Sequence, residues 1–380
     1  MANKYEEITF KSNGVLTLGV EVELQLIDQD NLNLTPRAND LLEAGKFIKN
    51  LKQEFYLSTV EVCTDKQDNV HQIKKDLKSS FDKLIPLGND LGLSFSSTGC
   101  HPFSRYSDCV ITPSPRYEEL INRNQWLTRR MTVYGLHVHL GMKDGHECIR
   151  FNNFFLPFLS HFLAISASSP FWQGEDTGLA SVRPTTYESM PTSGHPYEVS
   201  SWNEFESLYF TLKKCNAIDS LKDLWWDMRP SPGYGTLEIR VCDGFATLEG
   251  VLAVVAYIHL LAHWFNDNCS WFNQVQPCPR FLLRENKWRV MRYGLDAELV
   301  LNIDGKTAMV RDEIEMWLDI TKDYAKKFGY ESYIETLREI MKRGTSSDRQ
   351  RAVFNKTNST AEVVKHNIKE FLNQAPIWDI

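Results

Sequence analysis

Two glutamates lie close together in the segment LTLGVEVELQLID, residues 16–28, where polar and apolar residues alternate. Successive side chains of a β-strand point to opposite faces, so Glu21 and Glu23 would share one face and the valines and leucines the other. Burial of two like charges costs several kcal/mol for each ion unless a cation or hydrogen-bond donors compensate it. The segment therefore predicts a strand whose polar face is either solvated or holds a cation.

Three further segments repeat this alternation and carry ionisable groups on one face. They are STVEVCTD with Glu61, GLHVHLGM with His137 and His139, and GTLEIRVCD with Glu238 and Arg240. If the four strands belong to one sheet, their charged faces converge on a common concavity. Carboxylate oxygens with one imidazole suit Mg²⁺ or Mn²⁺ better than a structural zinc ion. The residues thus predict a metal site built from Glu21, Glu23, Glu61, Glu238 and one of the two histidines.

Such an acid-rich site is similar to metal sites that hold nucleotide phosphates, where arginines neutralise the transferred group. Arg183, Arg229 and Arg240 are the candidates for this role. Each lies in or next to a loop or strand marked by glycine or proline, and not on an amphipathic helix.

Each motif alone also has an ordinary structural explanation. Glu-x-Glu is typical of a solvated edge strand, His-x-His of core histidines bonded to the backbone, and Glu-x-Arg of a salt bridge. The sequence contains no P-loop, dinucleotide fingerprint, Gly-x-Ser-x-Gly or Cys-x-x-Cys motif. Two alternatives stay open at this point: a metal-dependent hydrolase that uses His-x-His on a barrel strand, and a non-catalytic protein that binds a nucleotide or a partner.

The bulk composition is that of an ordinary globular protein. Of 380 residues, 42% are hydrophobic and 24% charged, and the net charge is −7, which excludes a basic footprint for nucleic acid or anionic lipid. The N-terminus lacks a signal-peptide pattern and the eight cysteines form no Cys-x-x-Cys pair, so we expect a cytoplasmic protein with reduced thiols. The apolar segments 151–172 and 251–265 predict core helices and no membrane span.

Hydrophobic spacing predicts the elements around the four strands. Helices are predicted near residues 36–50, over 70–84 and over 114–133, and the stretch 91–99 alternates like a further strand. Residues 172–202 are predicted to form a long polar loop. The tail is predicted to be helical, with a capping box from Ser359 to Glu362. Strands that are flanked and followed by helices indicate an α+β fold around an antiparallel sheet.

Five stretches together resemble a known family, the glutamate-cysteine ligase type 2 family in its bacterial carboxylate-amine ligase branch. They are TLGVEVELQ (17–25), GLHVHLG (135–141), FWQGEDTGLASVRP (171–184), SLKDLWWDMRPSPGYGTLEIRV (220–241) and ENKWRVMRYGLDA (285–297). The stretches occur in the order of the family, and the long fourth one is the most specific.

The resemblance implies a glutamine synthetase-like fold, in which a curved antiparallel sheet with flanking helices carries the metals and ATP on its inner face. It implies a single catalytic domain over residues 1–380, with a core at about 15–300 and a helical C-terminal part at about 307–380. Family members join the carboxylate of glutamate or another acid to the amine of cysteine or another compound. ATP is cleaved to ADP and phosphate, and the reaction passes through an acyl phosphate.

Roles for individual residues follow from the same resemblance. The metal ligands would be Glu21, Glu23, Glu61, His139 and Glu238, holding Mg²⁺ or Mn²⁺, although His137 lies on the same face and the choice between the two histidines stays open. Arg240 and Arg183 would stabilise the transferred phosphoryl group and the tetrahedral intermediate. The residues expected to support ATP or the substrate are Glu21, Arg229, Glu238, Asn286 and Arg292.

The sequence departs from the family in one place. Members often carry a further acidic residue a few positions before Glu61, where this chain has Leu57 and Thr59. Either one metal position or the identity of the acid substrate therefore stays open. Relatives in this branch form small homo-oligomers, and we expect the same here, with small-molecule substrates and without nucleic acid or membrane partners.

Overall fold

The computed structural model describes residues 7–272 and 278–380, and its centre is one seven-stranded antiparallel sheet. The strands run in the order β10-β11-β5-β1-β3-β2, and β4 pairs with the far end of β1. Their bounds are β1 (Leu18–Asp28), β2 (Leu51–Gln53), β3 (Thr59–Cys63), β4 (Leu93–Ser96), β5 (Leu136–Gly141), β10 (Met228–Ser231) and β11 (Thr236–Ile239). This architecture confirms the predicted α+β class.

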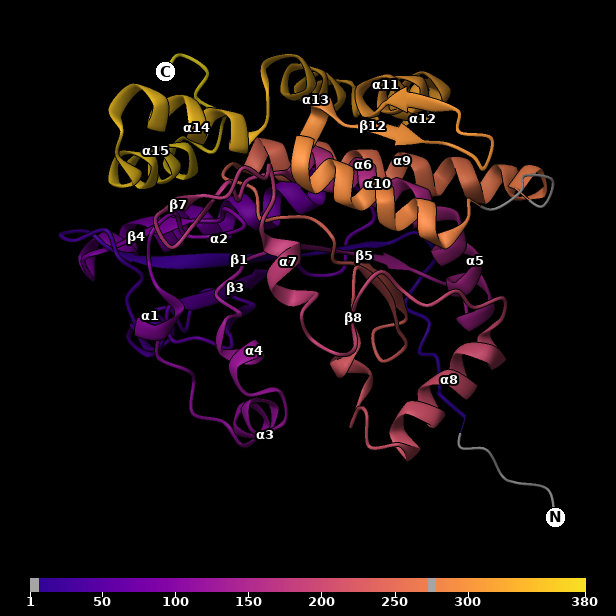
Figure 1. Ribbon diagram of the computed structural model, residues 1–380, viewed down its shortest axis with the longest axis horizontal. Coiled ribbons are helices and arrows are strands. Elements are labelled where there is room, and N and C mark those ends of the chain that lie inside the picture. Colours follow the sequence, from indigo (N-terminus) through magenta and orange to yellow (C-terminus); the bar gives the residue numbers. More distant parts are fainter. Residues whose placement is uncertain (1–6, 273–277) are drawn as a thin grey trace.

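Helices cover the apolar face of the sheet, above it in Figure 1. The long helices α2 (Val70–Asp90) and α9 (Leu248–Phe272) lie there together with α6 (Leu159–Ser166), and α5 (Gly145–Phe155) lies at the right end of the sheet in Figure 1. A further layer contains α10 (Arg280–Tyr293), α11 (Val310–Ile320), α12 (Lys322–Phe328) and α13 (Glu331–Arg343), followed by α14 (Ser346–Thr357) and α15 (Thr360–Asn373). One hydrophobic cluster runs through these layers and includes residues from Leu16 to Phe371.

Two apolar stretches are long enough to cross a membrane by composition alone. In the structure, 78% of the stretch Gly145–Ser166 and 83% of Leu248–Ser270 are buried against other parts of the chain. Burial inside the protein explains their hydrophobicity and agrees with the prediction of core helices.

Shorter elements surround the polar face of the sheet, below it in Figure 1. They are α1 (Ala38–Ala44), α3 (Pro115–Asn124), α4 (Trp126–Arg129), α7 (Arg183–Tyr187) and α8 (Trp202–Lys214), with the parallel strand pair β8 (Ser193–Gly194) and β9 (Trp225–Trp226). Two small pairs complete the fold: β6 (Phe171–Trp172) with β7 (Glu175–Asp176), and β12 (Glu298–Val300) with β13 (Thr307–Met309).

Three sequence expectations need correction in detail. The predicted helix over 114–133 is two helices, because Gln125 between α3 and α4 adopts a φ of 50°. The predicted loop 172–202 contains β7, α7 and β8. The Ser359 hydroxyl accepts the Glu362 N–H at 3.3 Å, as a cap requires, although the described bonds do not include the reciprocal one of a capping box.

Candidate active site

The strand register places the predicted ionisable residues side by side on one face of the sheet. Across β1, β3, β5 and β11, Cα partners are Glu23 and Glu61, Glu21 and His137, and Glu238 and His139. The alternation of each strand points these side chains away from the helices, because the intervening residues are core valines, leucines and isoleucines. The convergence expected from the four segments is therefore present in the structure.

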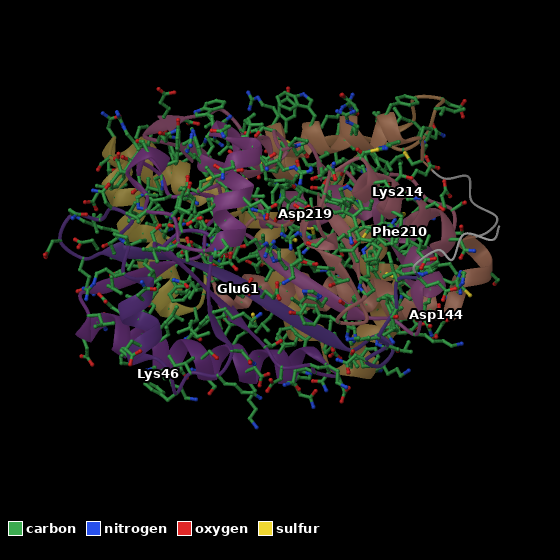
Figure 2. The ribbon with its side chains drawn as sticks, turned by 90° about the horizontal axis from the view of Figure 1, so that it is seen from below. Lys46, Glu61, Asp144, Phe210, Lys214 and Asp219 are labelled. Carbon is green, nitrogen blue, oxygen red and sulfur yellow. The ribbon has the colours of Figure 1, made fainter. Side chains whose placement is uncertain are left out.

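These side chains line a cavity of about 420 Å³ on the polar face. Of the predicted site residues, the lining includes Glu21, Glu23, Glu61, His137, His139, Arg229, Glu238 and Arg240. Figure 2 shows this face from below, with Glu61 beside the strands of the sheet and Lys46 near the edge of the molecule. Concave sites of this size with converging polar groups are typical of small-molecule binding.

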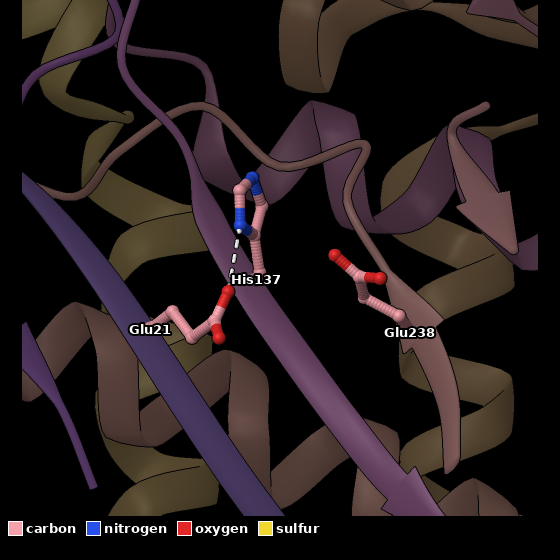
Figure 3. Close-up of side chains that lie close together, drawn as sticks. All are labelled: Glu21, His137 and Glu238. Carbon is pink, nitrogen blue, oxygen red and sulfur yellow. Dashed lines mark hydrogen bonds and ion pairs between the residues drawn. The ribbon is translucent and has the colours of Figure 1, made fainter. Parts of the chain in front are cut away.

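Among the residues that the structure describes, three sets of side chains bring ligand atoms within 4.8 Å of one another, and all three include Glu21 or Glu61. The sets are Glu21 with His137 and Glu238, Glu21 with Glu61 and Cys63, and Glu23 with Glu61 and His137. In Figure 3, Glu21 from β1 and His137 from β5 are joined by a hydrogen bond, and Glu238 from β11 extends into the same space. Such a set of mainly oxygen donors suits a hard divalent cation.

The two histidines differ in their surroundings. His137 Nδ1 lies 3.2 Å from Glu21 Oε2, whereas His139 Nδ1 lies 2.8 Å from the Thr236 hydroxyl and its Nε2 lies 3.6 Å from Glu21 Oε1. Burial and the nearby Arg240 lower the pKa of His137. Burial also opposes the charge on His139, but the nearby Glu21 carboxylate and the Glu238 charge outweigh it and raise its pKa. The Nε2 atoms of both rings are buried without a hydrogen-bond partner.

Glu21 is held ionised by these same histidines. Burial favours the neutral acid, but the hydrogen bond from His137 and the nearby His139 ring hold the pKa of Glu21 well below its usual value. Its neighbour Glu23 accepts a hydrogen bond from the Gly135 N–H at 2.5 Å. Both carboxylates are partly exposed to the cavity.

Glu238 is the best-paired carboxylate of the cavity. Arg229 Nε donates to Glu238 Oε2 at 2.8 Å, and Arg240 forms an ion pair with the other oxygen. Burial opposes ionisation, but the two arginines lower the pKa of Glu238 strongly. Arg229 Nη1 donates to the carbonyls of Leu221, Lys222 and Leu224 at 2.9–3.3 Å. Arg229 therefore fixes Glu238 and the adjacent loop.

In contrast to Glu238, Glu61 and the half-buried Glu54 have raised pKa values. Burial and the charge of Glu21 raise the pKa of Glu61 to about 7, and its closest partners are the Cys63 thiol at 3.0 Å and Lys52 Nζ at 3.3 Å. Burial and the charge of Glu61 raise the pKa of Glu54 well above its usual value. This edge of the cavity contains more carboxylates than cations.

Arg183 lies behind Arg240, where a small side cavity of about 60 Å³ continues from the main one. Its guanidinium donates to the carbonyls of Arg240 and Val241 at 3.3–3.4 Å and packs on the Tyr187 ring, 5.1 Å from the ring centroid. A Cβ at residue 135 would lie 2.3 Å from Arg183 Nη2, so a side chain there would displace the guanidinium. The buried Arg183 Nε has no hydrogen-bond partner.

The structure does not bring Asn286 and Arg292 to the cavity. The Asn286 side chain exchanges two hydrogen bonds with the backbone of Val300, at 2.7 and 2.8 Å, and so fastens α10 to β12. Arg292 is exposed and donates to the Gly178 carbonyl at 2.5 Å. Both side chains stabilise loops in the helical layer.

Several lining residues escaped the sequence analysis: Lys52, Glu54, Arg116, Tyr117, Lys222, Trp225 and Tyr234. Lys52 and Glu54 lie in and after the three-residue strand β2, which is too short to show a period. Glu54 precedes Glu61 by a few positions and lines the cavity. Leu57 instead packs against the hydrophobic core. Tyr234 occupies the Pro-Gly-Tyr-Gly turn between β10 and β11, and this turn was a usable signal.

The sheet topology tests the alternative of a metal-dependent barrel hydrolase. A barrel hydrolase requires regularly alternating strands and helices around parallel strands. Every described strand pair in the central sheet is antiparallel. The structure therefore contradicts the barrel hydrolase.

Sequence comparison matches residues 17–367 to the family described as "Glutamate-cysteine ligase family 2 (GCS2)". A protein from Bdellovibrio bacteriovorus named "Putative glutamate--cysteine ligase 2" is 43% identical over 362 residues, which are 95% of this chain and 96% of that protein. A protein of the same name from Thermobifida fusca is 36% identical over 375 residues, 97% of this chain and 94% of that one.

Two solved structures share the fold at low sequence identity. The glutamate–cysteine ligase from Francisella tularensis in complex with AMP aligns with a TM-score of 0.66 at 12% identity, covering 96% of this chain and 90% of that one. The complex of the prokaryotic ubiquitin-like protein Pup with its ligase PafA aligns with a TM-score of 0.53 at 11% identity, covering 96% and 78%. These likenesses confirm the expected fold.

Proposed function

Because this chain belongs to glutamate-cysteine ligase family 2 and is an enzyme of the carboxylate–amine ligase type, we propose that it joins an acid to an amine with cleavage of ATP to ADP and phosphate. The acid is activated as an acyl phosphate, which the amine then attacks to form an amide and release phosphate. Glutamate with cysteine is the first pair to test, since the relatives carry that name.

The convergence of Glu21, Glu23, Glu61 and Glu238 with the free His137 Nε2 in one cavity is the observation that carries this proposal. Around Glu61 the carboxylates outnumber the cations, which would destabilise the fold without a cationic ligand. The free His137 Nε2 has the same meaning, because a buried acceptor without a partner is costly. Both features fit a bound divalent metal with its nucleotide.

The chain's own residues suggest how Mg²⁺ or Mn²⁺ would be held. Glu21, Glu23, Glu61 and Glu238 offer oxygens, Glu54 offers a further one, and we assign the imidazole ligand to His137, which belongs to two of the three close ligand sets. Glu21 accepts from His137 Nδ1, which leaves its Nε2 lone pair available. The bound metal would neutralise the ATP phosphates and polarise the phosphoryl group that is transferred.

The arginines act on the other side of the reacting groups. Glu238 fixes the Arg240 guanidinium at the cavity wall, so its remaining donors are aimed at a negative charge that develops nearby. Arg183 stands directly behind it and adds positive potential in the side cavity, which fits the carboxylate of the acid. The pair would stabilise the oxyanion that forms when the amine attacks the acyl phosphate.

The test is product formation from defined substrates. The purified protein is incubated with ATP and Mg²⁺ and with pairs drawn from L-glutamate, other acids, cysteine and other amines. ADP, phosphate and the mass of the condensed product are measured. We expect ADP and phosphate in equal amounts with one amide per ATP for a specific pair. ATP hydrolysis that no acid stimulates, with no amide in any pair, contradicts the proposal.

Glu238→Gln is a poor variant for this test, although Glu238 is central to the site. Removal of its charge leaves Arg229 and Arg240 buried without their carboxylate, so lost activity would not be separable from lost structure. Glu61→Gln is better, because Glu61 has no arginine partner in the described chain.

A further inference from the structure

A second pocket, of about 320 Å³, lies between α10 and the segment from α7 to Tyr197. Among the described residues, none that lines this pocket also lines the catalytic cavity. Its charged and aromatic groups come from Glu188, His195, Tyr197, Arg280, Arg284 and Trp288. The ligase chemistry proposed above does not use these groups.

His195 lines this pocket and carries a hydrogen-bond acceptor that no described residue uses. Its Nδ1 lies 3.3 Å from the Pro196 carbonyl, which accepts only, so Nδ1 carries the proton and Nε2 has a lone pair. The residue is 8% exposed, and the buried Nε2 has no hydrogen-bond partner. Burial lowers the pKa of His195 to about 4, which keeps the ring neutral. A ligand in the pocket would therefore meet an acceptor that requires an N–H or O–H donor.

The arginines of the pocket are available to an anion. Arg284 is exposed and makes no hydrogen bond or salt bridge with the part of the chain that the structure describes. Arg280 donates to the His195 carbonyl at 3.2 Å and packs on the Tyr197 ring, which leaves other guanidinium donors free. The third cation, Lys287, is already saturated, because it bonds both oxygens of buried Asp227 at 2.6 and 2.7 Å and pairs with Glu188.

We propose that this pocket binds an L-α-amino acid with an apolar side chain, at a site separate from the catalytic cavity. The carboxylate lies against Arg284 and Arg280, the ammonium donates to His195 Nε2 and Glu188, and the side chain packs on Trp288 and Tyr197. A phosphate fits less well, since its oxygens would face the His195 lone pair and the Glu188 carboxylate. Trp288 is 49% exposed, and a ligand side chain would cover this apolar surface.

The pocket shares a wall with the catalytic arginines. Glu188 follows Tyr187, whose hydroxyl bonds Asp227 and whose ring supports Arg183. The Asp227 carbonyl also accepts the N–H of Arg240 at 2.7 Å. An ammonium that competes with Lys287 for Glu188 therefore acts on Tyr187, which packs on Arg183, and on Asp227, whose backbone bonds the backbone of Arg240. Occupancy of the pocket is expected to shift the KM for the acid substrate.

The experiment measures binding without ATP, so it is independent of the ligase proposal. Isothermal titration calorimetry is run with L-phenylalanine, L-leucine and L-methionine, and with 3-phenylpropionate and phenethylamine, which lack the ammonium and the carboxylate. We expect at least one amino acid to bind in the millimolar range or tighter. Arg284→Gln should weaken it at least about tenfold, and each truncated analogue should lose a similar factor. Arg289→Gln, on the same helix but outside the pocket, should bind normally.

Three results would overturn the inference. The first is the absence of binding by all three amino acids. The second is binding that Arg284→Gln leaves unchanged. The third is equal binding of 3-phenylpropionate, which would make the pocket a plain anion site. Trp288→Ala gives a second variant on the exposed surface, and its binding should fall for L-phenylalanine while the fold stays intact.

Discussion

Glu61 and Glu370 are both buried, but their pKa values are shifted in opposite directions. Glu370 is fully buried in α15, and Arg349 of α14 donates to its two oxygens at 2.5 and 3.2 Å. Burial opposes ionisation of Glu370, but Arg349 lowers its pKa below the usual value. Glu61 is 5% exposed and faces other carboxylates, so burial and Glu21 raise its pKa to about 7.

This difference distinguishes a buried carboxylate that is paired within the chain from one that requires a bound cation. A buried carboxylate with a bidentate arginine has its partner within the chain and needs nothing further. A buried carboxylate among like charges is unstable until a cation binds, and such strained groups cluster at functional sites. Asp227 belongs to the first class, because Lys287 and Tyr187 satisfy it. The carboxylates around Glu61 belong to the second.

The largest effect on stability is expected when a buried carboxylate loses its arginine partner. Arg349→Met leaves Glu370 buried with only His366 and the Ile377 N–H as described neighbours. We expect a loss of roughly 3–5 kcal/mol in the free energy of unfolding. Urea denaturation followed by circular dichroism measures it.

The control for this prediction is an exposed arginine pair. Arg338→Met removes the partner of Glu315, whose side chain is 43% exposed, and should cost less than about 1 kcal/mol. If Arg349→Met lowers the free energy of unfolding as little as Arg338→Met does, the Arg349–Glu370 pair contributes little to stability. The contrast between paired and unpaired buried carboxylates would then be wrong.

The substitution of glutamate by glutamine can be made both at the unpaired Glu61 and at the paired Glu370, and so compares the two kinds of carboxylate directly. At Glu61 it removes a metal ligand and one repelling charge. We expect turnover to fall about 100-fold or more while stability in metal-free buffer stays equal or rises. Glu370→Gln should do the reverse, with a large loss of stability. Steady-state ADP release and metal-free denaturation are measured on both variants; full activity in Glu61→Gln would remove Glu61 from the metal site.

The pH dependence of stability should differ in sign between the two carboxylates. Glu370 has a lowered pKa, so its stabilisation is present above the pKa of an unfolded glutamate and is lost as the pH falls. Glu61 has a raised pKa, so in metal-free buffer the folded state loses stability as the pH rises from about 4.5 through about 7.

Relative to Glu61→Gln, the wild type should therefore lose roughly 2–3 kcal/mol between pH 4.5 and 8 in the presence of a chelator. Excess Mg²⁺ should reduce this difference, because the cation replaces the proton. A constant difference across this range would show that Glu61 titrates as an ordinary exposed carboxyl. Denaturation curves at matched ionic strength, with and without chelator, measure the difference.

Strand alternation predicted much of the site because β1 is eleven residues long and its burial alternates from Leu18 to Leu24. The faces of Glu21, Glu23 and His137 followed from that period and from a sheet that joins the strands. The pairing of Glu238 with Arg229 was beyond this reasoning, since a single sequence does not give the register between β10 and β11. Asn286 was misplaced for a related reason, because nothing local reveals that its amide is used by Val300.

Short elements account for the other gaps. Glu54 follows a strand of three residues, and Arg116 and Tyr117 lie in the first turn of a short helix whose pattern does not distinguish the cavity from solvent. The break at Gln125 comes from a positive φ in a residue that is not glycine, which composition does not reveal. Hydrophobic periodicity thus identifies the polar and apolar faces of long strands and helices. The cavity residues on short elements depend on tertiary contacts, which periodicity does not show.

The smallest effect is expected at an exposed pair that joins two segments lining the cavity. Arg123 of α3 lies 3.7 Å from Asp219 and donates to the Asn216 carbonyl at 2.9 Å, and so joins the wall that carries Arg116 to the wall that carries Lys222. Arg123→Gln should change the free energy of unfolding by less than about 1 kcal/mol, like Arg338→Gln in the helical layer. It should nevertheless raise KM a few-fold, because the two walls bind substrate less tightly once they are unlinked, whereas Arg338→Gln should leave KM unchanged. Equal KM values for both variants would show that the walls hold their positions without this contact, and that exposed pairs at the cavity and in the helical layer behave alike.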